Sequence, residues 1–72
     1  MSYEVTTTIK EGFKTVKQDT FQRPTRQDAG ALMDSLLQFL STQDWEPVTM
    51  EDGDWTLRRG KQKIRIQVWE AI

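Results

Sequence analysis

The sequence predicts an α+β fold in which a single helix packs on one face of an antiparallel sheet, with the element order ββαβββ. Three observations support this prediction. Apolar residues recur at helical spacing over residues 26–42, apolar and polar residues alternate near the N-terminus, and glycine-containing turn signals divide the last third of the chain. The 72 residues are enough for one domain, so residues 1–72 are expected to form a single α+β unit.

The first expected strand covers residues 3–9. Its residues fall into two alternating sets, as in a half-buried strand: Tyr3, Val5, Thr7 and Ile9 against Glu4, Thr6 and Thr8. Glu11-Gly12 is expected to form the turn that follows.

Residues 13–17 are expected to return as a second strand, with the register left open. A two-residue turn would place Lys14 opposite Ile9, whereas a longer loop would place Phe13 there. Over residues 10–24 as a whole, the sequence is compatible with a strand, a loop or an arm ordered by a partner.

The helix is expected over residues 26–42. Thr25 after Pro24 predicts its start, because the threonine hydroxyl can accept a free backbone N–H and Asp28 lies near the positive end of the helix dipole. An apolar stripe at three- and four-residue spacing predicts its buried side, and it consists of Ala29, Leu32, Met33, Leu36, Phe39 and Leu40.

Two turn signals predict the last three strands. Asp52-Gly53 suits a type I′ hairpin turn, and Gly60-Lys61 suits a type II′ turn. The first turn implies three cross-strand pairs, namely Met50 with Trp55, Val48 with Leu57, and Glu46 with Arg59. The second implies Leu57 opposite Ile64 and Trp55 opposite Ile66.

The predicted register gives the sheet one apolar face, which the helix should cover. The residues expected there are Val48, Met50, Trp55, Leu57, Ile64, Ile66 and Val68. Trp45, at the end of the helix, is expected to join the same core.

The opposite face of the sheet is expected to be basic. Arg58 falls opposite Lys63, and such opposed like charges cost stability. Five of the ten basic residues gather at this hairpin: Arg58, Arg59, Lys61, Lys63 and Arg65. They are interpreted either as a contact surface for an anionic partner or as charges that keep the strands soluble and prevent edge-to-edge aggregation.

Trp69 follows Gln67 on the same face, because alternation directs Val68 inward. An exposed tryptophan near arginine is typical of binding hot spots. Two alternatives would bury it: a bulge that returns it to the core, or a first hairpin that covers this face.

The composition excludes most small-domain chemistry. The chain has no cysteine and no histidine, so it lacks thiolate nucleophiles and the commonest general base and metal ligands. The acidic residues Glu51, Asp52 and Asp54 lack the spacing of a calcium loop and suit a plain turn better. No catalytic, cofactor or metal site is expected, and the protein is not expected to be an enzyme. No apolar run is long enough for a membrane span and the N-terminus does not resemble a signal peptide, which favours a cytoplasmic location.

Three functional hypotheses follow. The leading one is a non-enzymatic regulatory, adaptor or inhibitor module that docks an acidic patch of another protein through the basic face, with Arg58, Arg59, Lys61, Lys63, Arg65, Gln67 and Trp69 as contact residues. The second is a nucleic-acid-binding domain that uses the same face, although the acidic residues before it count against this reading. The third is a structural subunit that forms homo-oligomers through a strand edge.

Overall fold

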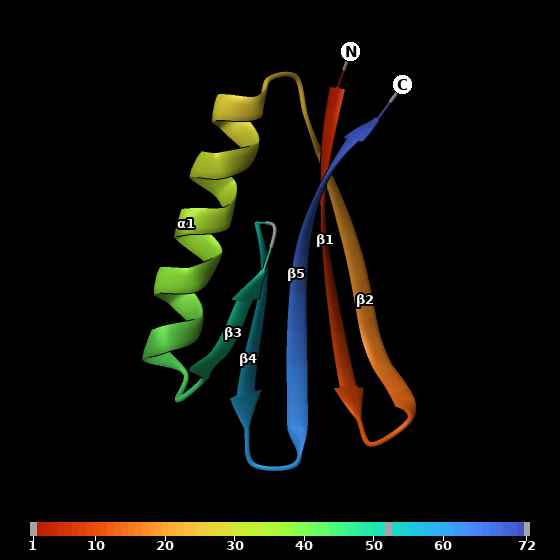
Figure 1. The fold of residues 1–72 in the computed structure, drawn as a ribbon, viewed down its shortest axis with the longest axis vertical. Helices are drawn as coiled ribbons and strands as arrows, with labels where there is room; N and C mark the ends of the chain where they lie inside the picture. Colours follow the sequence, from red (N-terminus) through yellow and green to blue (C-terminus); the bar gives the residue numbers. More distant parts are fainter. Residues whose placement is uncertain (1, 52, 72) are drawn as a thin grey trace.

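The computed structural model describes residues 2–51 and 53–71, and in that part of the chain one helix packs on a five-stranded antiparallel sheet (Figure 1). The elements are β1 (Ser2–Glu11), β2 (Lys14–Arg23), α1 (Arg26–Thr42), β3 (Glu46–Glu51), β4 (Asp54–Arg59) and β5 (Gln62–Ala71). The strand order in the sheet is β2-β1-β5-β4-β3. The predicted α+β class and the order ββαβββ are confirmed.

The first and last strands of the chain lie side by side in the middle of the sheet. β1 pairs with β5 in one uninterrupted register, from Ser2 opposite Ala71 to Glu11 opposite Gln62. This pairing joins the N-terminal hairpin to the C-terminal three strands, so all five strands form a single sheet.

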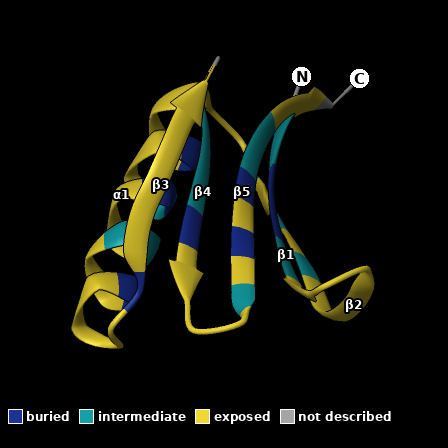
Figure 2. Cartoon of the chain, turned by 60° about the horizontal axis from the view of Figure 1, so that its bottom comes forward, coloured by how far each residue is buried: buried dark blue, intermediate teal, exposed yellow. Residues whose placement is uncertain are grey.

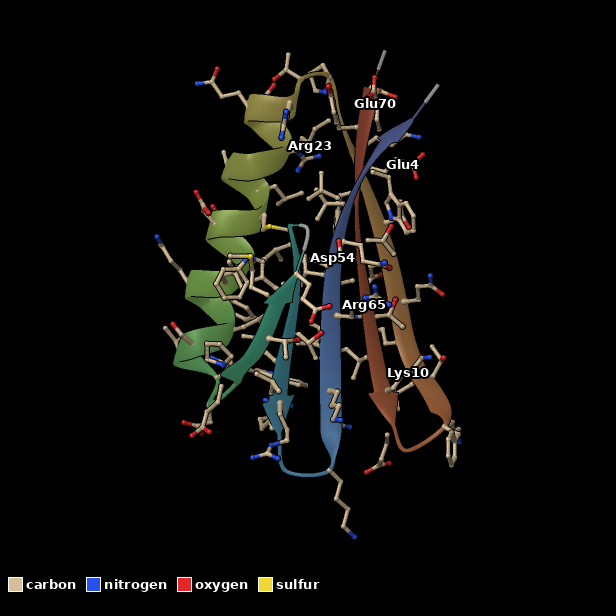
Figure 3. The ribbon with its side chains drawn as sticks, in the orientation of Figure 1. Glu4, Lys10, Arg23, Asp54, Arg65 and Glu70 are labelled. Carbon is tan, nitrogen blue, oxygen red and sulfur yellow. The ribbon has the colours of Figure 1, made fainter. Side chains whose placement is uncertain are left out.

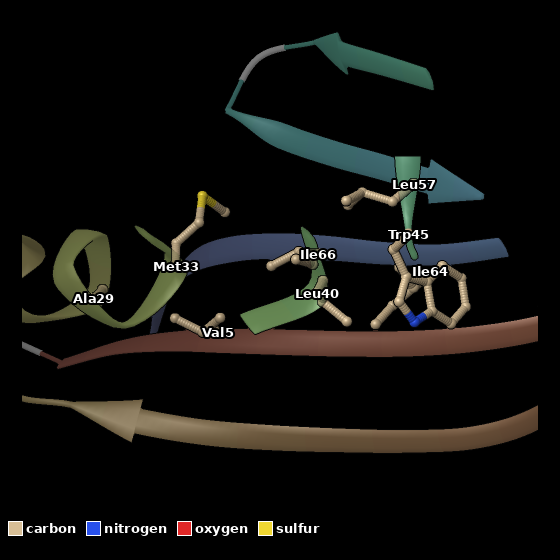
Figure 4. Close-up of a cluster of buried hydrophobic side chains, with 8 residues drawn as sticks. All are labelled: Val5, Ala29, Met33, Leu40, Trp45, Leu57, Ile64 and Ile66. Carbon is tan, nitrogen blue, oxygen red and sulfur yellow. The ribbon is translucent and has the colours of Figure 1, made fainter. Parts of the chain in front are cut away.

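The core lies between α1 and the sheet face that it covers (Figure 4). Val5, Leu57 and Ile66 are its most deeply buried large side chains, each with at most 1% of its surface exposed. The remaining buried apolar residues are Ala29, Met33, Leu40, Trp45 and Ile64. The predicted core positions of Leu57, Ile64, Ile66 and Trp45 are confirmed, and Trp55 and Val68 are partly buried against the same cluster.

The helix begins where the sequence predicts. Thr25 is the N-cap, and its Oγ1 accepts a hydrogen bond of 3.1 Å from the backbone N–H of Asp28. Asp28 also places a carboxylate in the first turn, where the helix dipole favours negative charge.

The predicted apolar stripe of the helix is confirmed except at Phe39. Ala29, Met33 and Leu40 are buried, and Leu32 and Leu36 are partly buried against the same core, whereas Phe39 is 60% exposed. Phe39 precedes Leu40 by one position and therefore lies about 100° around the helix from it. Phe39 is thus on the flank of the stripe, away from the centre of the contact with the sheet.

The helix ends in a hydrogen-bonded cap of the Schellman type, which the sequence pattern did not reveal. The backbone N–H groups of Gln43 and Trp45 both donate to the carbonyl oxygen of Leu40, at 3.0 and 3.1 Å. Asp44 between them has a φ of 66°, a left-handed conformation usually taken by glycine. This cap reverses the chain and carries Trp45 into the core beside Leu40.

The predicted β3–β4 register is correct at the turn end and wrong further along. Met50 lies opposite Trp55 as predicted, but Pro47 faces Leu57 in place of Val48, and Glu46 faces Arg58 in place of Arg59. The cause is an irregularity between Pro47 and Thr49, where one extra residue of β3 shifts the pairing by one position.

β3 also contributes less to the core than predicted. Every residue of this edge strand is exposed (Figure 2), including Val48 at 50% and Met50 at 58%. As one of the two edge strands, β3 has a neighbour on one side only, so its apolar side chains are less covered than those of β4 and β5.

Both predicted C-terminal turns fall between the expected strands. Gly60 has a φ of 60°, as a type II′ turn requires at its first central position, and Leu57 and Trp55 face Ile64 and Ile66 as predicted. Gly53 has a φ of 83°, but Asp52 lies outside the described residues, and so does the predicted type I′ conformation at that position.

The first hairpin differs from both registers left open by the sequence. Its turn consists of Gly12 and Phe13, and Ile9 faces Lys17, because an irregularity at Ile9/Lys10 adds one residue to β2. β2 continues to Arg23, well beyond the residues 13–17 that were predicted, so residues 14–23 form a strand.

The cap at Asp44 gives a direct test of the fold. Asp44→Gly is expected to raise the free energy of unfolding by about 0.5–1 kcal/mol, because glycine adopts positive φ without steric cost. The control Asp44→Ala removes the same charge from the helix end but keeps the Cβ atom, and should gain less. Urea denaturation of the three proteins checks this order, and an alanine variant as stable as the glycine variant would contradict the assigned cap.

Candidate binding surface

The sheet face opposite α1, called here the outer face, carries a row of basic side chains. Lys10 of β1 lies opposite Lys63 of β5, and Lys63 lies opposite Arg58 of β4. These three residues, called here the basic row, occupy neighbouring positions on three adjacent strands, and all three are exposed. Directly opposed residues have Cβ atoms only about 4.5–5.5 Å apart, so the row concentrates positive charge.

No carboxylate neutralises the basic row within the described part of the chain. The ion pairs found there are Lys17 with Asp19 and Arg65 with Asp54. Glu46 faces Arg58 at the end of the row, but the two residues form no ion pair. Since opposed like charges on a sheet are destabilising, the row lowers the stability of the isolated protein.

Arg65 is predicted to belong to the same surface, but its charge is compensated. Its Nη2 atom lies 3.1 Å from Oδ2 of Asp54 (Figure 3). Nε2 of Gln67 donates to the same oxygen at 3.4 Å. The Arg65 side chain is 57% exposed. Such a surface ion pair contributes little to stability and mainly fixes the positions of the side chains.

Trp69 lies on the outer face near the other end of β5. It is 49% exposed and faces Glu4 on β1. The first hairpin does not cover it, because β2 extends the sheet beside β1. Trp69 lies six residue steps along the extended strand from Lys63, which corresponds to about 20 Å.

Arg59 does not join the outer face, although it was predicted as a contact residue. Its guanidinium carbon lies 4.6 Å from the centroid of the Trp45 ring, and its Nη1 donates to the carbonyl oxygen of Gln43 at 3.1 Å. Arg59 therefore links the end of β4 to the end of α1 through a cation–π contact and a hydrogen bond.

The outer face contains a pocket with a volume of about 430 Å³. It lies where β1, β4 and β5 approach the turns of their hairpins, and Lys10, Lys61, Lys63 and Arg65 contribute its charged lining. Thr8 and Thr56 add hydroxyl groups. No described acidic residue lines this pocket.

The structure thus brings together most of the predicted contact residues and adds one. Arg58, Lys63, Arg65, Gln67 and Trp69 share the outer face, and Lys61 lines the pocket from the turn. Lys10 was missed. Alternation from Ile9 could have placed it on the outer face, but no local signal indicates that β1 lies beside β5.

The described residues contain no group of three or more acidic side chains close enough to hold a metal ion. In the same part of the chain, no helix combines the length and the apolar character needed to cross a membrane. No family model, no curated protein and no solved structure matches the chain.

Arg59 and Arg58 form a matched pair for separating structural from surface roles. Arg59→Ala is expected to lower the free energy of unfolding by about 1 kcal/mol, because it removes the contact with Trp45 and the hydrogen bond to Gln43. Arg58→Ala, on the other side of the same strand, should be neutral or slightly stabilising. Equal losses in chemical denaturation would contradict the structural role given to Arg59.

Proposed function

We propose that this protein is a non-enzymatic binding module that docks an acidic surface of another protein through the outer face of its sheet. The observation that carries the proposal is the uncompensated basic row of Lys10, Lys63 and Arg58. The repulsion in this row lowers the stability of the free protein, but a partner that neutralises the charges removes this cost in the complex.

Trp69 and the basic row supply the two kinds of contact that such an interface needs. The exposed indole offers a large apolar surface, and tryptophan and arginine are frequent among the residues that dominate binding energy. These groups lie about 20 Å apart along β5, so a single partner surface of ordinary size can contact both.

The distribution of acidic residues favours a protein partner over a nucleic acid. Glu4 faces Trp69, Asp54 pairs with Arg65, and Glu46 faces Arg58 at the end of the basic row. A phosphate backbone that crossed this face would meet these carboxylates, whereas a protein surface can present matching charges of both signs. The net charge of −1 also gives no general attraction for nucleic acid.

The absence of cysteine and histidine from the sequence supports a binding role over a catalytic one. The pocket on the outer face is lined by cations, hydroxyl groups and an amide, a set suited to holding an anion. Regulation, adaptation or inhibition of the partner are the roles open to a module of this kind.

The proposal is tested by charge reversal on the outer face. Partners are captured with the intact protein, the strongest is purified, and its affinity is measured by calorimetry for the wild type and for Arg58→Glu/Lys63→Glu. A loss of at least about 10-fold is expected, because attraction becomes repulsion at two positions.

The matched control is Lys14→Glu/Lys17→Glu, which makes the same change in charge on β2, the strand on the far side of β1. Its affinity should stay within about threefold of the wild type. Equal losses in both variants would contradict docking through the outer face. Fluorescence anisotropy with labelled DNA and RNA tests nucleic-acid binding through the same face. Salt-sensitive binding that Arg58→Glu/Lys63→Glu abolishes would show that the partner is a nucleic acid and not a protein.

A further inference from the structure

We propose that the pocket at the turn end of the outer face is a binding site for a phosphate-type oxyanion. The inference extends the proposed docking function, since it names the chemical group that enters this part of the face. It stands on the composition of the pocket, and free anions test it without any protein partner.

The positive charge of the pocket is greater than one carboxylate could neutralise. Of its four basic residues, Arg65 is already paired with Asp54, which leaves the ammonium groups of Lys10, Lys61 and Lys63. Lys10 and Lys63 are direct cross-strand neighbours, so a shared anion between them would relieve their repulsion. A phosphate group carries a charge of about −1.5 to −2 at neutral pH, and therefore suits this site better than a carboxylate.

The donors around the pocket also match the chemistry of a phosphate group. Each lysine offers three N–H donors, and the hydroxyl groups of Thr8 and Thr56 can donate as well. Phosphate presents several acceptor oxygens in different directions, and lysine binds it as a point charge without needing one fixed geometry.

The pocket has room for a group larger than a single free ion. Its volume of about 430 Å³ falls in the range of small-molecule sites, about 300–1,000 Å³. Two sources of the same chemistry fit this space: a phosphorylated side chain of the partner, or a free polyphosphate such as pyrophosphate. Both require the three lysines.

The test is a titration of the isotope-labelled full chain with inorganic phosphate, pyrophosphate and a phosphoserine peptide, followed by ¹H–¹⁵N NMR at constant ionic strength. Saturable shifts are expected at Thr8, Gly12, Lys61, Lys63 and Gln67, with pyrophosphate binding more tightly than phosphate. Tighter binding of the phosphopeptide than of pyrophosphate, together with no binding of its unphosphorylated form, would identify a partner side chain as the source. The opposite order would identify a free polyphosphate.

Lys10→Gln/Lys63→Gln should weaken binding of pyrophosphate at least about 10-fold, whereas Lys14→Gln/Lys17→Gln, which removes two charges outside the pocket, should leave it unchanged. A rise in melting temperature with pyrophosphate, present in the control and absent in the pocket variant, provides a second readout. The proposal is overturned if no saturable shift appears by about 10 mM pyrophosphate, or if both variants lose binding equally. If a variant loses anion binding but keeps its affinity for the partner, only the link between the pocket and docking is overturned. If a variant loses docking but keeps anion binding, the pocket is a site independent of docking.

Discussion

The hydrogen-bonded ladder between β1 and β5 joins the two ends of the chain, and both faces of the sheet follow from it. On the covered face it places Val5 beside Val68 and Ile9 beside Ile64, under the helix. On the outer face the same ladder places Lys10 beside Lys63. Because side chains alternate along a strand, a slip of one residue would exchange these faces, so the burial of Val5 and Ile66 also fixes the position of the basic row. The apolar core and the charged surface are therefore two results of one register.

In this register, the buried residues stabilise the fold, whereas the basic residues proposed for docking destabilise it. The buried residues favour the pairing that brings Lys10, Lys63 and Arg58 into adjacent positions, while the repulsion among these residues opposes it. The conflict is confined to exposed side chains, where its cost is small beside the burial of residues such as Leu57 and Ile66. Surfaces shaped for binding commonly keep local costs of this kind, and a partner or an anion that neutralises the row removes the cost.

Local chemistry was sufficient to predict some of these elements and insufficient for others. The Thr25 cap and the apolar stripe predicted α1, and Gly60 predicted the β4–β5 register, because each signal lies within a few residues of the structure that it determines. The irregularities at Ile9/Lys10 and at Pro47/Thr49 have no such signal, and each shifts the residues beyond it by one position. The length of β2 was missed because an edge strand with one neighbour is largely exposed and shows little apolar alternation.

The difference between local signals and long-range pairing also explains which residues of the outer face could be predicted from the sequence. Alternation along β5 was enough to place Lys63, Arg65 and Trp69 on one face. Arg59 was grouped with them because it is near in sequence, although its position in β4 directs it to the end of α1. Lys10 lies far from Lys63 in sequence, and only the β1–β5 pairing brings it to the basic row and to the pocket.

A double-mutant cycle between Lys10 and Lys63 shows whether the pairing of β1 with β5 is the origin of the basic row. The free energy of unfolding is measured at low ionic strength for the wild type, Lys10→Gln, Lys63→Gln and the double variant. Each single substitution is predicted to stabilise the isolated protein, by roughly 0.2–1 kcal/mol, and the double variant should gain less than the sum because both substitutions remove the same repulsion. Additive effects, or single substitutions that destabilise, would contradict the pairing of β1 with β5 as the origin of the basic row.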